Sequence, residues 1–390
     1  MYEIVDRLEK NDKLGFYTVN GKKYHNKIQA LIEATRTGNH PVWNFNQTVF
    51  DREDWLSDPP ETINELYRQR AQQLRDQYDY IILNLSGGAD STTVLYSFVN
   101  NGIFIDEVVV RHPESGIKDL YITDNTNSPD NAYSEWKFAA VPLLNWLRSV
   151  SPNTKITTHD FWEDFQTPDY EEDWVFLGRD YLHPGIVSRY KYDLDWLKQV
   201  YEDRSKVCML FGIDKPRICI RDGSYYLYFL DIQANTAVCE TKEYDNICTE
   251  YFYWTPDLPK IAIKQAHMIA DWFEAQPNPA IKTLLRWPNK DVSQRTTYEM
   301  IVKTIIYPDY DFRTFQAAKP TSCFQTEVDS WFYKNFQGTR PWEIWQRGLD
   351  FVKSNIDDRW FNYRFENKDG FMGFISPFYK TKDVKNEFVS

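Results

Sequence analysis

One run of residues in the chain has the types and spacing needed to bind a polyphosphate. It consists of Ser86, Gly87, Gly88, Ala89, Asp90 and Ser91, with Thr92 directly after it. We expect Gly87 and Gly88 to adopt φ > 0, and because they lack a Cβ their backbone N–H groups can close on phosphate oxygens. The hydroxyl groups of the run supply further hydrogen-bond donors. The predicted chemistry is therefore the binding of a phosphate-rich anion.

The segments on either side of this run predict the two elements that must position it. Residues 79–85 are short, apolar and partly β-branched, as expected of a buried strand. Residues 90–101 place their apolar side chains on one face of a helix. The N-terminus of such a helix carries a partial positive charge, which favours an anion in the loop before it.

The pattern S-G-G-x-D-S distinguishes this loop from three others of similar composition. The segment lacks the lysine of a Walker A loop, the third glycine of a G-x-G-x-x-G dinucleotide fingerprint and the G-x-S-x-G of a nucleophile elbow. It resembles the loop of the PP-loop ATP pyrophosphatases, also called the adenine nucleotide alpha-hydrolase-like superfamily. The chain is similar to uncharacterised bacteriophage-encoded members that are labelled phosphoadenosine phosphosulfate reductase-like. The resemblance covers about residues 79–260 and is specific at the loop.

The resemblance implies an ATP-dependent reaction with Mg²⁺. In such proteins the loop holds the β- and γ-phosphates, an acceptor oxygen attacks the α-phosphorus, pyrophosphate leaves, and a second nucleophile displaces AMP. The acceptor is an unidentified small molecule or nucleobase. The implied nucleotide-binding residues are Ser86, Gly87, Gly88, Ala89, Asp90, Ser91, Thr92 and Arg111. For Arg111, which follows the second predicted strand, a place in a solvated loop is the alternative.

Asp90 leaves two interpretations open. A carboxylate beside a polyphosphate repels it unless a cation intervenes, so Asp90 suggests a Mg²⁺ ligand. An aspartate at the start of a helix can instead cap the helix and take no part in the chemistry.

Positive charge opposite the loop is predicted to come from the segment after a later strand. A strand ending at Gly212 is followed by Asp214, Lys215 and Arg217. Departing pyrophosphate requires cations that the loop itself does not contain. We therefore assign catalytic roles to Lys215, Arg217 and Asp90, and candidate magnesium ligation to Asp90 and Asp214. An ordinary charged turn is the alternative.

The order of the predicted elements indicates an α/β protein. Strands are expected at 79–85, 105–112, 154–161 and 206–212, alternating with helices at 90–101, 134–150 and 187–204. This alternation predicts a parallel sheet with right-handed crossovers, and the resemblance implies a doubly wound, HUP-like one. Pro142 should kink its helix. A hairpin that turns on Asp222-Gly223 is expected at 218–230.

Three regions follow from these patterns. Residues 1–78 form an N-terminal α+β leader region, with a hairpin on Asn20-Gly21 and two helices. Residues 79–260 form the PP-loop nucleotide-binding α/β domain. Residues 261–390 form an aromatic-rich, mostly helical C-terminal subdomain.

The composition argues against other classes of function. The formal net charge is −12, from 45 basic and 57 acidic residues, which disfavours general DNA binding. No apolar run approaches the ~18 residues of a membrane span, and no signal peptide is visible. Five cysteines without a C-x-x-C pair are typical of reduced thiols. We expect a cytoplasmic protein that binds no membrane, in the host cytoplasm if it is phage-encoded.

Two other functions stay open beside ATP-dependent adenylylation. A nucleotide-binding protein without turnover could have a structural or regulatory role, for instance in a virion, with the aromatic-rich C-terminal region contacting a protein partner. A sulfonucleotide reductase-like protein is disfavoured, because the resemblance would then require a redox cysteine near the C-terminus and the last cysteine is Cys323.

Overall fold

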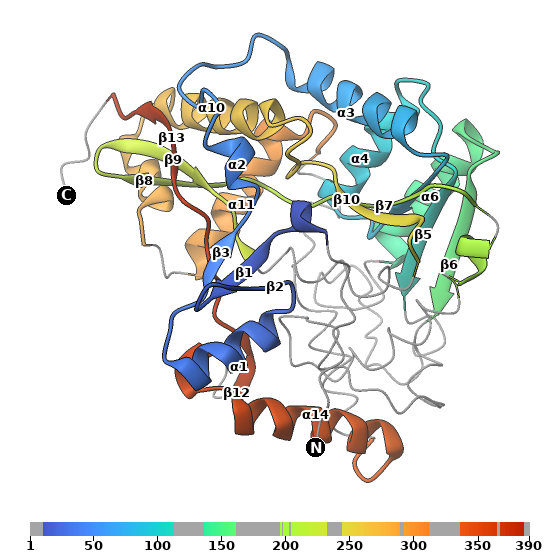
Figure 1. Ribbon diagram of the computed structural model, residues 1–390. Helices are drawn as coiled ribbons and strands as arrows, with labels where there is room; N and C mark the ends of the chain where they lie inside the picture. Colours follow the sequence, from blue (N-terminus) through green and yellow to red (C-terminus); the bar gives the residue numbers. More distant parts are fainter. Residues whose placement is uncertain are drawn as a thin grey trace, which may run out of the picture.

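A five-stranded sheet with all strands parallel carries the predicted loop (Figure 1). Its strand order is β10-β7-β4-β5-β6, so that β4 (Tyr80–Asn84), the strand before the loop, lies in the middle. The other strands are β5 (Glu107–His112), β6 (Lys155–Asp160), β7 (Val207–Phe211) and β10 (Ile247–Tyr251). The predicted parallel α/β sheet is thereby confirmed. The computed structural model describes residues 11–112, 136–160, 196, 198–202, 204–231, 244–288, 292–311, 336–364 and 367–385.

Strands β4, β5 and β7 are buried on both faces of the parallel sheet, because successive residues point to opposite sides and consecutive residues of each strand are buried. Ile81 and Leu83 belong to the large hydrophobic cluster that includes the flanking helices α3 (Ile63–Gln77) and α4 (Ala89–Val99). Tyr80 and Ile82 belong to a second cluster on the other face, with Trp196 and Val200. Residues 198–202 are helical, and most of the helix predicted at 187–204 lies outside the described residues.

The helices begin where the sequence provides suitable terminal residues. In α3, the Thr62 hydroxyl accepts from the Glu65 N–H and the Glu65 carboxylate accepts from the Thr62 N–H. The helix expected around Pro142 is present, and its predicted kink stays a prediction. A π-helical turn, Trp136–Ala140, runs directly into α6 (Val141–Val150), and Pro142 is the second residue of α6. Because proline has no N–H to donate, the regular hydrogen-bond pattern is interrupted at this point of the helix.

Two antiparallel sheets have three strands each. One has the order β2-β1-β3, with β1 (Phe16–Val19), β2 (Lys22–Tyr24) and β3 (Val42–Asn44). The other has the order β13-β9-β8, with β8 (Arg217–Arg221), β9 (Ser224–Tyr228) and β13 (Tyr379–Asp383). Both predicted hairpin turns are present, with positive φ at Asn20, Gly21, Asp222 and Gly223.

The remaining elements are mostly helical. They are η1 (Asp12–Leu14), α1 (Lys27–Thr37), α2 (Gln47–Phe50), α10 (Lys260–Glu274), η6 (Pro279–Leu285), α11 (Val292–Ile306), α14 (Arg340–Asn355), η7 (Asp358–Trp360) and the hairpin β11 (Phe361–Arg364) with β12 (Asn367–Phe371). No helix in the described part of the chain is long and apolar enough to cross a membrane.

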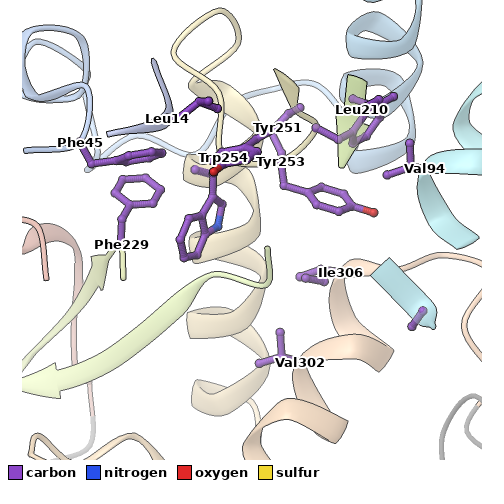
Figure 2. Packing of buried hydrophobic residues seen from close by; sticks show 14 of the residues in the cluster. Leu14, Phe45, Val94, Leu210, Phe229, Tyr251, Tyr253, Trp254, Val302 and Ile306 are labelled. Carbon is purple, nitrogen blue, oxygen red and sulfur yellow. The ribbon is translucent and has the colours of Figure 1, made fainter. Parts of the chain in front are cut away.

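One hydrophobic cluster joins the leader region, the parallel sheet and the C-terminal region (Figure 2). The Phe229 ring lies 4.8 Å from that of Phe45 and 5.2 Å from that of Trp254, measured between ring centroids. Val302 and Ile306 of α11 belong to the same cluster. Much of the aromatic content therefore fills the core.

A buried ion pair also links distant segments. The Lys27 ammonium lies 2.8 Å from the carboxylate of Asp231, and neither side chain is exposed to solvent. The same carboxylate accepts from the hydroxyl of Tyr17 at 2.7 Å and from the backbone N–H of Phe374 at 2.7 Å. Three regions of the chain thus meet at one charged group.

Candidate anion-binding site

The S-G-G-A-D-S loop joins the carboxyl end of β4 to the first turn of α4. Gly87 has φ +76°, and a Cβ built there would lie 2.9 Å from the backbone nitrogen of Ala140. Position 87 therefore requires glycine both for its conformation and for the close approach of the π-helical turn. The expectation of φ > 0 at Gly88 is wrong: Gly88 has φ −74° and ψ 163°, the extended geometry common at an N-cap.

Backbone N–H groups at the start of α4 point out of the helix. The first bond within the helix runs from the N–H of Thr92 to the carbonyl of Gly88, so the N–H groups of Ala89, Asp90 and Ser91 precede the helical pattern. Such groups, together with the helix dipole, attract anions. Ala89, Ser91 and Thr92 are themselves buried.

The two serines of the loop stabilise its shape. The Ser91 hydroxyl accepts from the N–H of Ser86 at 3.2 Å, and the two hydroxyl oxygens are 3.3 Å apart. The N–H of Gly88 donates to the Ser86 hydroxyl at 3.3 Å. Ser86 is exposed, so its hydroxyl can reach a bound anion.

The carboxylate of Asp90 is bound by two side chains from other elements. Lys215 donates to both of its oxygens, at 3.0 and 2.9 Å, and the hydroxyl of Tyr307 donates to one of them. The helix-cap interpretation is wrong, because the N-cap is Gly88 and no side chain caps the helix. Burial alone would raise the pKa of Asp90, but the Lys215 charge and the Tyr307 hydrogen bond hold it below its usual value.

Lys215 and Arg217 are the centre of a row of alternating charges. Lys215 also contacts Asp214 at 3.3 Å, and Arg217 bridges Asp214 and Glu299 at 3.0 Å each. Burial alone would lower the pKa of both cations, but the adjacent carboxylates keep each above its ordinary value. The structure thus brings Asp90, Asp214, Lys215 and Arg217 together and buries most of this row.

Gly212 allows the segment after β7 to pass behind the loop. A Cβ at Gly212 would lie 3.1 Å from the backbone carbon of Asp90 and 3.1 Å from the nitrogen of Ser91. These are backbone atoms at the start of α4 and have little room to move. This close approach places Lys215 beside Asp90.

The C-terminal region contributes side chains that the sequence patterns did not indicate. Glu299, Lys303 and Tyr307 recur every fourth residue along α11 and its end, which puts them on one helix face. Tyr298 donates to the carbonyl of Pro216 at 2.7 Å and accepts from the N–H of Ile218 at 3.0 Å. In the sequence, the spacing of residues 299, 303 and 307 indicates that they share one helix face. It does not indicate which part of the protein that face contacts.

Another contact comes from the end of the parallel sheet. The Tyr253 hydroxyl donates to the backbone carbonyl of Asp90 at 2.8 Å. Tyr253 follows β10, at the edge of the sheet beside β7. The loop is therefore held from the sheet side as well as from α11.

Arg111 lies at the same edge of the sheet as the loop. It is the fifth residue of β5 and donates to the side-chain oxygen of Asn84, the last residue of β4, at 2.7 Å. It is half-buried in a strand and not part of a solvated loop. Next to it, the His112 ring stacks on Trp136 with centroids 3.6 Å apart.

The histidine, cysteine and acidic side chains elsewhere in the described residues form no second candidate site for a metal ion or for redox chemistry. Within the described residues there is no group of three or more His, Cys, Asp or Glu side chains that could hold a metal ion. Cys208, Cys219 and Cys248 form no disulfide among the described residues, and Cys239 and Cys323 lie outside those residues.

No family model matches the chain, and no curated protein is significantly similar to it in sequence.

Proposed function

We propose that this protein is an ATP pyrophosphatase of the PP-loop type, with a doubly wound HUP-like sheet, which adenylylates an unidentified acceptor. The observation that carries the proposal is the place of the loop in the sheet. From β4 the chain moves outward through β5 and β6 on one side, and then returns to β7 and β10 on the other. Ligands of open parallel sheets bind at such a reversal, outside the carboxyl ends of the strands.

The segments after β4 and β7 flank this reversal, and they contain the loop and Lys215 respectively. In our proposal the N–H groups at the start of α4 and the Ser86 hydroxyl bind the β- and γ-phosphates of ATP. An acceptor oxygen forms a bond to the α-phosphorus as the bond to the β-phosphate oxygen breaks, and the electron pair leaves with pyrophosphate. A second nucleophile then displaces AMP. Lys215 would exchange a carboxylate for a phosphate oxygen and stabilise the departing charge.

Asp90 and Asp214 do not fit a magnesium ion held by the protein. All four of their carboxylate oxygens already accept hydrogen bonds from Lys215 or Arg217. We therefore derive no step through a metal at these residues. Mg²⁺ enters this proposal as part of the substrate, Mg-ATP.

Nucleotide binding without turnover is the second candidate. It is favoured by the pairing of the site cations, since Lys215 and Arg217 each lie between two carboxylates. A protein that only binds a nucleotide has no need to release either cation from these partners.

The test is equilibrium binding of α-labelled ATP to the full chain, followed by incubation with candidate acceptors and detection of pyrophosphate and AMP. Gly87→Ala should abolish binding. Gly102→Ala is the matched control, because Gly102 also has positive φ but a Cβ there meets no atom within 4 Å. Binding with no pyrophosphate from any acceptor would select the second candidate. If the wild-type chain does not bind ATP, both are wrong.

A further inference from the structure

Asp90 and Asp214 form a pair of carboxylates on two different elements, joined by one ammonium group. The side chain of Asp90 is 25% exposed and that of Asp214 is 8% exposed. Lys215 lies between them, 7% exposed, with its Nζ 2.9 Å from Asp90 and 3.3 Å from Asp214. Two carboxylates from separate segments that converge on one cation resemble the ligand pair of a divalent metal site, but here the cation is a side chain.

Every oxygen of this pair accepts at least one hydrogen bond from a cationic side chain. Both oxygens of Asp90 accept from Lys215, and one also accepts from Tyr307. In Asp214, one oxygen accepts from Lys215 and the other from Arg217. Magnesium requires ligand oxygens at about 2.0–2.1 Å in octahedral geometry. An ion that bridged the two carboxylates at these distances would occupy the place of the Lys215 ammonium.

The charges of the surrounding row make that displacement unfavourable. Asp90, Asp214 and Glu299 face Lys215 and Arg217 in alternation, and Lys303 lies close enough to lower the pKa of Asp90. A doubly charged ion added here would lie near the positive charges of Arg217 and Lys303, and of Lys215 if that side chain stayed. Water screens the repulsion between buried charges only weakly. An ammonium of single charge balances the row better.

We propose that the ammonium of Lys215 takes the place of a divalent cation between Asp90 and Asp214, so that this protein binds its polyphosphate ligand without a metal ion on that pair. Asp90 is then a positioning residue, which holds Lys215 at the start of α4. The inference rests on the proposed function only for the identity of the ligand. The test of this inference uses no nucleotide. Its result is therefore independent of whether the protein binds or cleaves ATP.

The test is a titration of the full chain with Mn²⁺ and no nucleotide. The electron paramagnetic resonance signal of unbound Mn²⁺ measures how much of the ion is bound. The wild-type chain should show no saturable site below millimolar Mn²⁺. Lys215→Met, which keeps an unbranched side chain one atom shorter and removes the charge, should bind one Mn²⁺ about tenfold or more tightly than the wild type, because the ammonium no longer occupies the space between the two carboxylates. Mn²⁺ should also raise the melting temperature of this variant and leave that of the wild type unchanged.

Two controls separate a new site from a general effect of removing a buried lysine. Lys282→Met removes a lysine that is 1% exposed and pairs with the single carboxylate of Glu274 at 2.7 Å, and it should not bind Mn²⁺ more tightly. The double variant Lys215→Met, Asp90→Asn should lose the site that the single variant gains.

A micromolar Mn²⁺ site in the wild-type chain that disappears in Asp90→Asn would overturn the proposal. So would a folded Lys215→Met variant that binds Mn²⁺ no better than the wild type. If Lys215→Met does not fold, the comparison of the wild type with Asp90→Asn decides alone: no wild-type site supports the proposal, and a site that needs Asp90 rejects it.

Discussion

The hydroxyl of Tyr307 donates a hydrogen bond to the carboxylate of Asp90, although 217 positions separate the two residues in the chain. Burial raises the pKa of Tyr307 well above its ordinary value, and the charge of Asp90 raises it further, so the phenol remains a donor. The contact joins the end of α11 to the first turn of α4. The C-terminal region is thereby part of the site and not an appendage to it.

Tyr307→Phe should lower the free energy of unfolding by about 1.5–3 kcal/mol, since it removes one hydrogen bond to a charged group while Lys215 still binds Asp90. Urea-induced unfolding measures this change. Tyr310→Phe is the control, because the Tyr310 hydroxyl is buried with no hydrogen-bond partner among the described residues. Equal effects of the two substitutions would show that the Asp90 contact contributes nothing.

Lys215→Ala should lower turnover by roughly 10²–10³-fold and weaken ATP binding less, as expected of a group that acts mainly on the departing pyrophosphate. Steady-state kinetics of pyrophosphate release, with any acceptor that supports it, measure both effects. Lys282→Ala, outside the charged row, should keep normal turnover. A Lys215→Ala variant with wild-type kinetics would exclude Lys215 from the reaction.

Gly212→Ala should destabilise the protein by about 1–3 kcal/mol, because the added methyl group meets backbone atoms of Asp90 and Ser91. It should also weaken ATP binding, since relief of the contact shifts the start of α4. Gly223→Ala meets no atom within 4 Å and should leave ATP binding unchanged. Unfolding and binding measurements on both variants test this. Wild-type ATP affinity in Gly212→Ala would mean that α4 tolerates the displacement.

His159 should make the protein less stable as the pH falls below 6.5. Burial, with the nearby Arg111 charge, lowers the pKa of His159 from 6.5 to about 3. Between these values the unfolded chain binds a proton that the folded protein does not, so the contribution to stability is complete above pH 6.5 and is lost as the pH falls toward 3. The loss between pH 7.5 and pH 5 should be about 1–2 kcal/mol.

The comparison that isolates this effect is the difference in unfolding free energy between the wild type and His159→Gln at several pH values. Gln does not titrate, so the difference should change over this range. A difference that is independent of pH would show that His159 does not titrate differently in the two states.

The local parts of the fold could be predicted from the sequence. The strand at 79–85, the loop and the helix after it depend on residues that are neighbours in the chain, and β4 and α4 confirm them. β10 could not be predicted in this way, because Thr249 and Glu250 interrupt its apolar residues. The burial of Glu250 is compensated by Arg70 and Tyr78, which donate to its carboxylate at 2.8 and 2.7 Å, and by Lys13, whose ammonium lies 3.7 Å from it.

In the candidate site too, some residues could be predicted from the sequence and others could not. Position 212 and the charged residues after it could be assigned to the loop because β4 and β7 are expected in one parallel sheet. The contacts of Glu299 and Tyr307 depend on how α11 packs against a segment more than 80 residues earlier in the chain. No periodicity in α11 indicates that partner, and a buried polar face on a helix has too weak a hydrophobic pattern to be assigned to the core.

The buried charge of Asp231 has a consequence for synthesis on the ribosome. Its backbone donor, the N–H of Phe374, lies 143 residues further along the chain. At a translation rate of about 5–20 residues per second, roughly 7–30 s separate the appearance of the two residues. During that interval the nascent chain contains Lys27 and Asp231 but cannot complete the environment that surrounds them, and β13 has not yet paired with β9. The final packing around Lys27 and Asp231 must therefore follow translation of the C-terminal strand, so this part of the core is completed only after the whole chain has been made.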